Sequence, residues 1–568
     1  MKKGYICLIT IYIFIMLRKF DFRNYKAFDQ GSIELKPITI LLGANSSGKS
    51  SLLQLLLLFE QTLNTERGYE SALKLNGKYT SLGETENIFK NKDLDKKLSF
   101  AFEIEFDSLH EYFRETRNLK RFIERDIDDM HYEFKKIEAK LLTRDYRFRT
   151  RTLSSDANFL NYVKDIKKIK KEILNNYPKE NVLFEELSSE YEKEKLFSEN
   201  PRLKRVFNKE LNEYIEAYQA LESLSNLKIR KFVIEYGVHY NKKHNTLDIS
   251  SVSIRNNDVL LIEYKIERNK GHKKFILTSE ILNNRILNKY RITFGRNTDF
   301  EALDLVPKDR SEDTLKYNRG YIGDSIFCSM LIRFINIFSS SLHRSFSNSR
   351  INYISPLRAF PKRYYFLDES NVSSSLDSID GDNLTEILKK EHRLTQKVNK
   401  WLNNFELSVS IEDVKEVIHR LKVTQNGLSL DITDVGFGIS QVLPIIVQGF
   451  LSKNESITII EQPEIHLHPK MQAELADLFI DVITSDENNK ALLIETHSES
   501  ILKRLRRRIA EGKISNEDVA IYFIHSRQKK SSSAKVERLA ISNTGAFDWP
   551  KEFYSTDLED TTEYLKYQ

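Results

Sequence analysis

The segment that most constrains the fold is the loop from Gly43 to Ser50, which reads GANSSGKS. It follows the apolar run ITILL and precedes the leucine-rich run SSLLQLLLLFEQTL, so the sequence predicts a strand, a tight turn and a helix in that order. Its two glycines let the backbone curl so that its amides face an anion, which the positive end of the helix also favours. The spacing fits G-x-x-x-x-G-K-S and predicts a phosphate-binding loop in an α/β fold.

This loop supplies the candidate ligands for a nucleotide. Lys49 is expected to reach the β- and γ-phosphates, and Ser50 to offer its hydroxyl to Mg²⁺. The expected cofactors are therefore ATP and Mg²⁺. The residues expected to bind the cofactor are Gly43, Ala44, Asn45, Ser46, Ser47, Gly48, Lys49, Ser50 and Ser51.

A second apolar strand lies far along the chain, where SITII is followed by residues 461–464, read EQPE. If this strand runs parallel to the one before the loop, Glu461 stands at its carboxyl end and can hold Mg²⁺ directly or through water. Gln462 and Glu464 are further candidates for a catalytic role. Apolar residues recur at helical spacing after Pro469, so that stretch is interpreted as a core helix.

A histidine follows a third apolar strand, in which ALLIE leads into residues 496–498, read THS. A helix is predicted to begin there, capped by Ser498 or Ser500. An imidazole at the end of such a strand can hydrogen-bond a γ-phosphate. His497 is therefore the fourth candidate catalytic residue, on the strength of the two motifs that accompany it.

A glycine-containing turn from Asp434 to Gly438 leads into an apolar helix before the second strand. Such a turn can offer backbone amides and a helix N-terminus to an anion. The alternative interpretation is a flexible connection.

Composition constrains location and partners weakly. The formal net charge is +6, from 88 basic and 82 acidic residues among 568, which is only a mild preference for a polyanionic partner. Cys7 and Cys328 form no spaced cluster, which argues against a disulfide framework and suits the reducing cytoplasm. The apolar run from Tyr5 to Leu17 falls short of the ~20 residues that cross a bilayer and lacks a small-residue cleavage site. We therefore expect a leader segment in a cytoplasmic protein, not a membrane anchor.

Neither end of the chain supplies a complete nucleotide site, so both ends are expected to meet in one α/β core interrupted by a long insertion. The opening LRKFDFRNYKAF alternates as an edge strand does. Within the insertion, FKKIEAKLL and YVKDIKKIKKEIL predict paired or coiled helices. Strands are predicted at IRKFVIEYGV, DVLLIEYKIE and KKFILTSE.

Four segments resemble the conserved motifs of one ATPase family. In order and spacing, GANSSGKS, DVGFGISQVLP, IIEQPEIHLHP and IETHSE resemble the phosphate loop, signature, Walker B with D-loop and switch histidine of SMC-like and OLD-like ABC-type AAA ATPases. DVAIYFI followed by GAFDWPKEFY resembles the short end domain of a prokaryotic branch. The resemblance implies an ABC-type P-loop NTPase head interrupted by a helical and strand-containing insertion. The expected divisions are a leader at 1–15, ATPase lobes at 16–106 and 350–515, the insertion at 107–349 and the end domain at 516–568.

The resemblance also implies a homodimer, with nucleotide held between two subunits. Gly436, Gly438, Ser440 or Gln441 of one subunit would face the phosphates bound by Lys49 of the other. The signature here reads GFGISQ and not LSGGQ, which leaves the residue alignment across it open.

A second departure concerns catalysis, because the usual glutamate after the Walker B carboxylate is Gln462 here, which cannot accept a proton. Either hydrolysis is slow, or Glu464 or the water-orienting amide of Gln462 suffices.

Many prokaryotic ATPases of this architecture serve antiviral defence, including PtuA-like ATPases of Septu systems and retrons. The resemblance therefore implies a partner such as an HNH endonuclease, or a reverse transcriptase with its RNA or DNA. The alternatives are an SMC- or RecF-like repair ATPase and an OLD-like nuclease, although spaced Toprim carboxylates are missing after His497. A basic run on a predicted helix can contact nucleic acid or form a solvated face: Lys503, Arg504, Arg506, Arg507 and Arg508.

Overall fold

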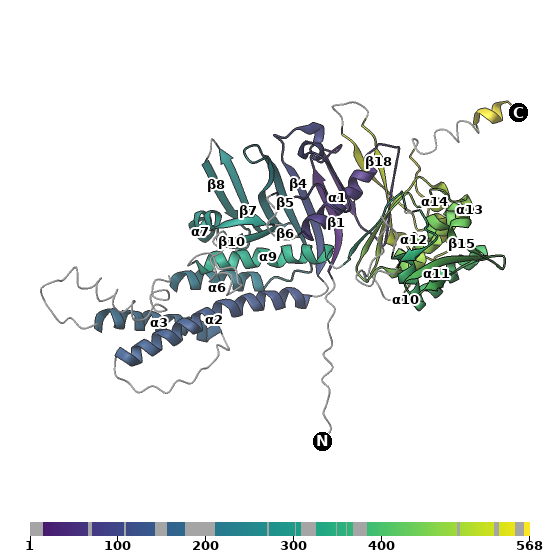
Figure 1. Ribbon diagram of the computed structural model, residues 1–568. Helices are drawn as coiled ribbons and strands as arrows, with labels where there is room; N and C mark the ends of the chain where they lie inside the picture. Colours follow the sequence, from purple (N-terminus) through teal and green to yellow (C-terminus); the bar gives the residue numbers. More distant parts are fainter. Residues whose placement is uncertain are drawn as a thin grey trace, which may run out of the picture. The chain divides into compact units, whose positions relative to one another are not determined.

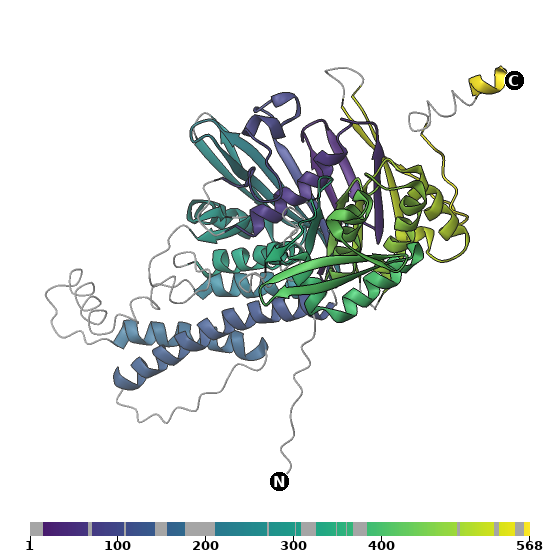
Figure 2. The same ribbon diagram turned by 45° about the vertical axis from the view of Figure 1, so that its right-hand side comes forward.

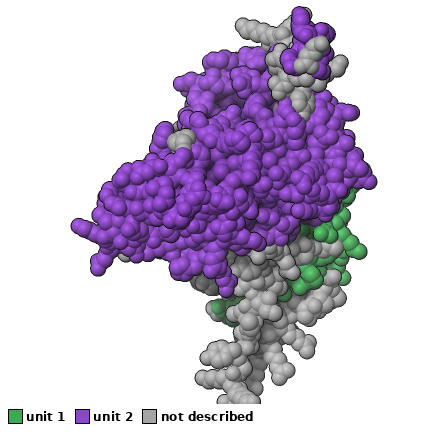
Figure 3. All heavy atoms as spheres, turned by 90° about the vertical axis from the view of Figure 1, so that its right-hand side faces the viewer, with its two compact units in different colours: residues 1–13, 106–233, 250–340 green, residues 14–105, 234–249, 341–568 purple. Residues whose placement is uncertain are grey.

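The computed structural model describes residues 15–65, 71–106, 109–141, 156–176, 211–269, 272–301, 303–307, 325–347, 349–358, 360–366, 383–485, 489–527, 533–550 and 562–567. The expected leader lies outside these residues except for Ile15. The chain forms two compact units, coloured separately in Figure 3. Residues 106–233 and 250–340 belong to unit 1, and residues 14–105, 234–249 and 341–568 belong to unit 2. The expected insertion at 107–349 thus contributes two short stretches to unit 2, residues 234–249 and 341–349.

Unit 2 is built on a six-stranded sheet in the order β11-β16-β17-β3-β18-β19, in which only β19 is antiparallel. Every residue of β3, β16 and β17 is buried, as expected for parallel strands covered on both faces. The carboxyl ends of these strands therefore meet at one edge. The strands are β3 (Ile38–Gly43), β11 (Ile351–Ile354), β16 (Ile457–Glu461), β17 (Ala491–Glu495), β18 (Val519–His525) and β19 (Lys535–Leu539).

Helices cover both faces of this sheet. Ile38, Ile40 and Leu42 of β3 share an apolar core with three helices that follow in sequence. These are α12 (Phe437–Leu451), α13 (Pro469–Thr484) and α14 (Glu499–Ala510). On the other side, α1 (Lys49–Leu63) contacts β3 and β17 (Figures 1 and 2). Phe59 of α1 packs against Phe102 of β4 (Leu98–Phe106). The predicted helix start at Pro469 is confirmed, and of the two serines proposed as caps for α14 the structure uses Ser498.

The segment predicted as an end domain begins inside this sheet. DVAIYFI forms β18, which pairs in parallel with β3 from Val519 opposite Ile38 to Ile524 opposite Gly43. It therefore lies beside the phosphate loop.

A second, seven-stranded sheet has the order β2-β1-β4-β5-β6-β7-β8. The strand predicted at LRKFDFRNYKAF is confirmed, but its edge position is wrong, because β1 lies between β2 and β4. Alternation shows which face is buried, here by Phe20 and Phe22, and not whether a neighbour pairs on each side. The strands are β1 (Ile15–Arg23), β2 (Gln30–Glu34), β4 (Leu98–Phe106), β5 (Lys231–Asn241), β6 (Thr246–Asn256), β7 (Val259–Asn269) and β8 (His272–Thr278). The strands predicted within the insertion are thereby confirmed.

Between β11 and α12, unit 2 carries a small helical and strand region. Its helices are α10 (Leu384–Lys390) and α11 (His392–Leu402), and its strands are β12 (Tyr365–Phe366), β13 (Leu407–Lys415), β14 (Ile418–Gln425) and β15 (Leu428–Asp431).

Short 3₁₀ turns lie elsewhere in the described chain and in this region, at η1 (Thr85–Ile88), η2 (Lys90–Lys92), η3 (Asn403–Phe405), η4 (Ile432–Asp434) and η5 (Asn516–Asp518).

Unit 1 contains the predicted charged helices. α2 (Leu109–Leu141) packs against α3 (Asp156–Asn176) and α6 (Leu211–Ser225), which confirms paired helices (Figure 1). Its other elements are α7 (Asn284–Asn297), β9 (Thr298–Glu301), β10 (Asp304–Pro307) and most of α9 (Ile326–Phe346). Among the described helices, α9 alone is long and apolar enough to span a membrane, and 72% of its most apolar window is buried inside the protein.

Candidate nucleotide-binding site

The phosphate loop joins β3 to α1 and depends on its two glycines. Gly43 has φ +149° and Gly48 has φ +112°, a region that other residues rarely adopt. A Cβ on Gly43 would lie 2.5 Å from the carbonyl oxygen of Ile524, and one on Gly48 would lie 2.8 Å from the ring of Phe28. Both positions therefore need glycine for conformation and for space.

Lys49 and Ser50 lie where the loop enters the helix. The Nζ of Lys49 donates to the carbonyl oxygens of Gly43 at 3.0 Å and Ala44 at 2.9 Å. The Oγ of Ser50 donates to Oε2 of Glu495 at 3.0 Å, and the other carboxylate oxygen lies 3.7 Å from Lys49 Nζ. Burial lowers the pKa of Lys49, while the charge of Glu495 acts in the opposite direction. The ammonium group is thus held at the centre of the loop.

Glu495 is the site residue that the sequence analysis missed. Glu495 ends the strand ALLIE two residues before His497, and a carboxylate at the end of an apolar strand beside the predicted histidine was a usable signal. Burial raises the pKa of Glu495, and Lys49 partly opposes that rise. Glu495 is therefore the carboxylate that hydrogen-bonds the predicted Mg²⁺ ligand.

Glu461 ends β16 at the same edge, as predicted. It stands directly opposite Glu495 in the parallel register of β16 and β17. The hydroxyl of Tyr353 on β11 donates to Glu461 Oε1 at 3.0 Å. Burial, followed by the charge of Glu495, raises the pKa of Glu461 to about 7. Two buried carboxylates thus lie side by side near Ser50.

Gln462 and Glu464 form the turn after β16. Gln462 has φ +45°, and its backbone N–H donates to the carbonyl oxygen of Glu495 at 2.8 Å. Both carboxylate oxygens of Glu464 are occupied, since Thr496 Oγ1 donates to one at 2.8 Å and the backbone N–H of His497 donates to the other at 2.7 Å. Burial raises the pKa of Glu464. Glu464 therefore positions the loop that carries the histidine.

Two buried polar atoms at this edge fit a bound phosphate. His497 Nε2 and Ser47 Oγ are shielded from solvent and make no hydrogen bond to the described residues. Burial lowers the pKa of His497, and the charge of Lys49 lowers it further, which favours the neutral imidazole, in which one ring nitrogen can donate. The hydroxyl of Ser50 and the carboxylate of Glu461 are the hard oxygen ligands that Mg²⁺ prefers. The residues present therefore fit both ATP and Mg²⁺.

Two arginines contact the turns that border the site. Arg358 is buried, and its Nη2 donates to the carbonyl oxygens of Glu461 and Gln462, each at 3.2 Å. Burial lowers the pKa of Arg358 to about 10. Arg363 pairs with Asp434 at 2.7 Å, in the turn before α12. One arginine thus fixes the turn after β16, and the other fixes the approach to the signature segment.

The signature residues differ in accessibility. Gly436 is exposed at the N-terminus of α12, whereas Ser440 and Gln441 are buried within their own chain. A Cβ on Gly438 would lie 3.1 Å from the carbonyl oxygen of His466, so this glycine allows close packing against the turn after β16. The N-terminal part of this segment is thus the part open to a second molecule.

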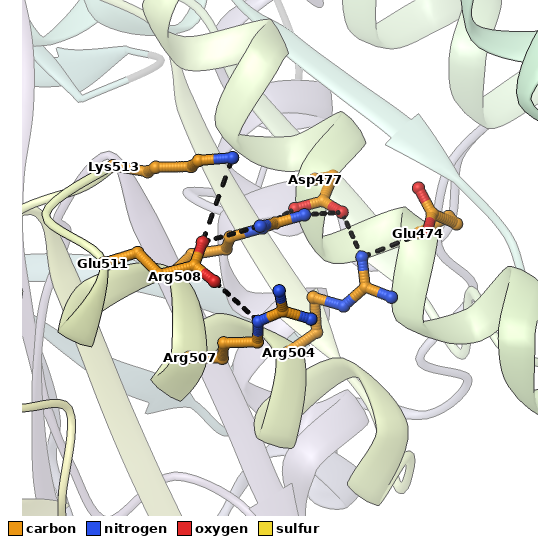
Figure 4. Close-up of polar contacts among 7 residues, drawn as sticks. All are labelled: Glu474, Asp477, Arg504, Arg507, Arg508, Glu511 and Lys513. Atoms are coloured by element: carbon orange, nitrogen blue, oxygen red, sulfur yellow. Dashed lines mark hydrogen bonds and ion pairs between the residues drawn. The ribbon is translucent and has the colours of Figure 1, made fainter.

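The basic run of α14 pairs within the chain. Arg504 and Arg508 both contact Asp477 of α13, and Arg504 also contacts Glu474 at 3.0 Å (Figure 4). Arg507 and Arg508 pair with Glu511. The guanidinium of Arg506 lies over the rings of Phe547 and Trp549, and Lys503 pairs with Glu499. Because these basic side chains pair within the chain, they favour an ordinary helix face over a nucleic-acid-binding surface.

A phosphate loop between a parallel strand and a helix, with carboxylates at the ends of neighbouring strands, defines the P-loop class of nucleotide-binding proteins. The family described as AAA ATPase domain matches residues 16–502, and the chain belongs to this family. It is an ATPase of the AAA type.

No curated protein matches the sequence. One similar solved structure is the Smc head domain with an extended coiled coil bound to the C-terminal domain of ScpA, from Pyrococcus furiosus. It has 9% identity and a TM-score of 0.32, covering 97% of this chain and 99% of that one. Another is the SMC head domain from Thermotoga maritima, with 6% identity and a TM-score of 0.31, covering 93% of this chain and 100% of that one. Similarities this low carry no residue role over to this chain.

Proposed function

We propose that this chain binds ATP with Mg²⁺ and hydrolyses it slowly as an ABC-type, nucleotide-driven switch. The observation that carries the proposal is the meeting of Lys49 and Ser50 with Glu461 and Glu495 at one sheet edge, from segments more than 400 residues apart in sequence. Ser50 and Glu461 would hold the magnesium ion, which would offset the charge of the phosphates. Lys49 would neutralise the same phosphates, and the neutral His497 would donate a hydrogen bond to the γ-phosphate.

The slow rate follows from the residues around the expected water. Gln462 can orient a water molecule but cannot take its proton. Glu464 is already committed to Thr496 and His497, so it is the weaker candidate for a general base.

Nucleotide binding is tested by titrating a fluorescent ATP analogue in the presence of Mg²⁺. The wild-type protein should show saturable binding, and Lys49→Ala should abolish it because the loop loses its ammonium group. Lys503→Ala is the matched control, since Lys503 lies on α14 and pairs with Glu499. Absence of saturable binding by the wild-type protein would overturn the proposal.

ATP would also join two copies of the chain. The exposed Gly436 of one copy would approach the phosphates held by Lys49 of the other, and hydrolysis would release the two copies. The homodimer is supported by the exposure of Gly436 and by the resemblance of the four motifs to ABC-type ATPases.

The same resemblance supports a cytoplasmic role in antiviral defence with a separate nuclease. The test is affinity purification of the tagged chain from its own cells, with and without ATP. Recovery of an HNH endonuclease or a reverse transcriptase is expected. Recovery of a permease or of repair proteins in their place would overturn this setting.

A further inference from the structure

The carboxylate of Glu495 is buried at the centre of the candidate site. Its side chain is 5% exposed and lies on β17, between the strand of Glu461 and the strand of the phosphate loop. One carboxylate oxygen accepts a hydrogen bond from Ser50 Oγ, and the other lies 3.7 Å from Lys49 Nζ. The two residues that the sequence assigns to the phosphates and to Mg²⁺ therefore share this one carboxylate.

The pairing of Glu495 with Glu461 points to a cation. Partner residues on adjacent parallel strands direct their side chains to the same face, and like charges in that arrangement destabilise a sheet. Glu464 adds a third, half-buried carboxylate at the same edge. Among the described residues, the one ammonium group close to this pair is that of Lys49. A divalent ion would offset the remaining charge.

The contact with Ser50 indicates how Glu495 would act on that ion. A serine hydroxyl has one proton and two lone pairs. Because the hydroxyl proton is engaged in the hydrogen bond to Glu495, the lone pairs of Ser50 Oγ are left for a metal ion. Carboxylates that hydrogen-bond a metal ligand in this way orient it and make it a stronger donor.

We propose that Glu495 is part of the magnesium site, where it orients Ser50 Oγ toward the ion and adds a second carboxylate beside Glu461. This inference rests on the proposed function, because the ion binds together with the nucleotide. It assigns a role to a residue outside the phosphate loop and outside the turn after β16.

The test compares the Kd of a fluorescent, non-hydrolysable ATP analogue in saturating Mg²⁺ and in EDTA. The ratio of the Kd in EDTA to the Kd in Mg²⁺ measures what the metal contributes to nucleotide affinity. Glu495→Gln should reduce this ratio about 10- to 100-fold, the usual cost of losing such a partner. The Kd in EDTA should stay equal or become tighter, because a negative charge near the phosphates is removed.

The matched control is Glu60→Gln, the same substitution at a buried carboxylate nearer the other end of α1. It should keep the wild-type ratio. A double-mutant cycle adds a second readout, since Glu495→Gln should change the ratio much less when Ser50 is already alanine. If Glu495→Gln does not fold, Glu495→Asp is titrated with Mn²⁺ by electron paramagnetic resonance, where weaker Mn²⁺ binding than in the wild type supports the proposal and unchanged binding overturns it.

Three outcomes separate the explanations. Unchanged Kd values in both conditions for Glu495→Gln overturn the magnesium role. Equal weakening in Mg²⁺ and in EDTA also overturns it, because Glu495 would then act only through Lys49. Absence of nucleotide binding by the wild-type protein overturns the proposed function itself.

Discussion

Gln462 occupies the position after the Walker B carboxylate, and its amide cannot accept a proton from water. Gln462→Glu would introduce a base at the end of β16, and general-base catalysis contributes at least about 100-fold. We therefore expect kcat for phosphate release to rise by roughly that factor, with little change in nucleotide affinity. Steady-state phosphate release measures this. Unchanged turnover would contradict the assignment and direct attention to Glu464.

Glu60 on α1 offers a prediction about stability and pH. Burial raises its pKa from 4.5 to about 7, although Asn64 donates a hydrogen bond to it. A raised pKa means that the folded state holds the proton more tightly, so this contribution is complete below pH 4.5 and is lost as pH rises through 7. Glu60→Gln should raise the free energy of unfolding by about 3 kcal/mol at pH 8 and by almost nothing near pH 4. Urea unfolding at the two pH values measures the difference, and an equal effect at both would contradict it.

At the scale of secondary structure, α13 and α14 are joined through Asp477. Burial alone would raise the pKa of Asp477, but hydrogen bonds and charge from Arg508, with the charge of Arg504, lower it. A lowered pKa gives stability that is present at neutral pH and is lost as pH falls below the ordinary value of 3.8. Asp477→Asn should therefore cost about 1.5–3 kcal/mol at pH 7.

The measurement for Asp477→Asn is the urea midpoint at pH 7 and near pH 3. Glu499→Gln is the control, since Glu499 makes a more exposed pair with Lys503 of the same helix. An equal loss in both variants would show that Asp477 has no special role in joining the helices.

The sequence predicted those elements whose signals are local. The strand, loop and helix around Lys49 follow from contiguous residues, and so does the helix that begins at Pro469. The contact of Ser50 with Glu495 was not predictable, because it joins residues 445 positions apart and depends on which strands are neighbours. The edge position predicted for β1 was wrong for the same reason, because alternation gives the buried face and not the pairing.

At the scale of the whole chain, residues near both ends build one site, and unit 1 lies between them in sequence. Beside that site, Leu357 is 86% exposed and Phe360 is 77% exposed. The intervening Arg358 is anchored to the turn after β16. Apolar side chains this exposed next to a nucleotide edge suit a surface that a second copy covers.

We therefore expect the protein to dimerise in the presence of ATP and Mg²⁺. The double variant Leu357→Ser with Phe360→Ser should weaken the dimer at least about tenfold, because two apolar side chains buried in an interface contribute more than about 1.4 kcal/mol. Sedimentation velocity with a non-hydrolysable ATP analogue measures the dimer fraction. The Kd of the monomer for nucleotide should not change, because neither side chain belongs to the phosphate loop. Tyr567→Ser is the control, as an aromatic residue 88% exposed near the C-terminus. If the double variant dimerises as the wild type does, these two residues lie outside the interface. A wild-type protein that stays monomeric with nucleotide would contradict the two-subunit site itself.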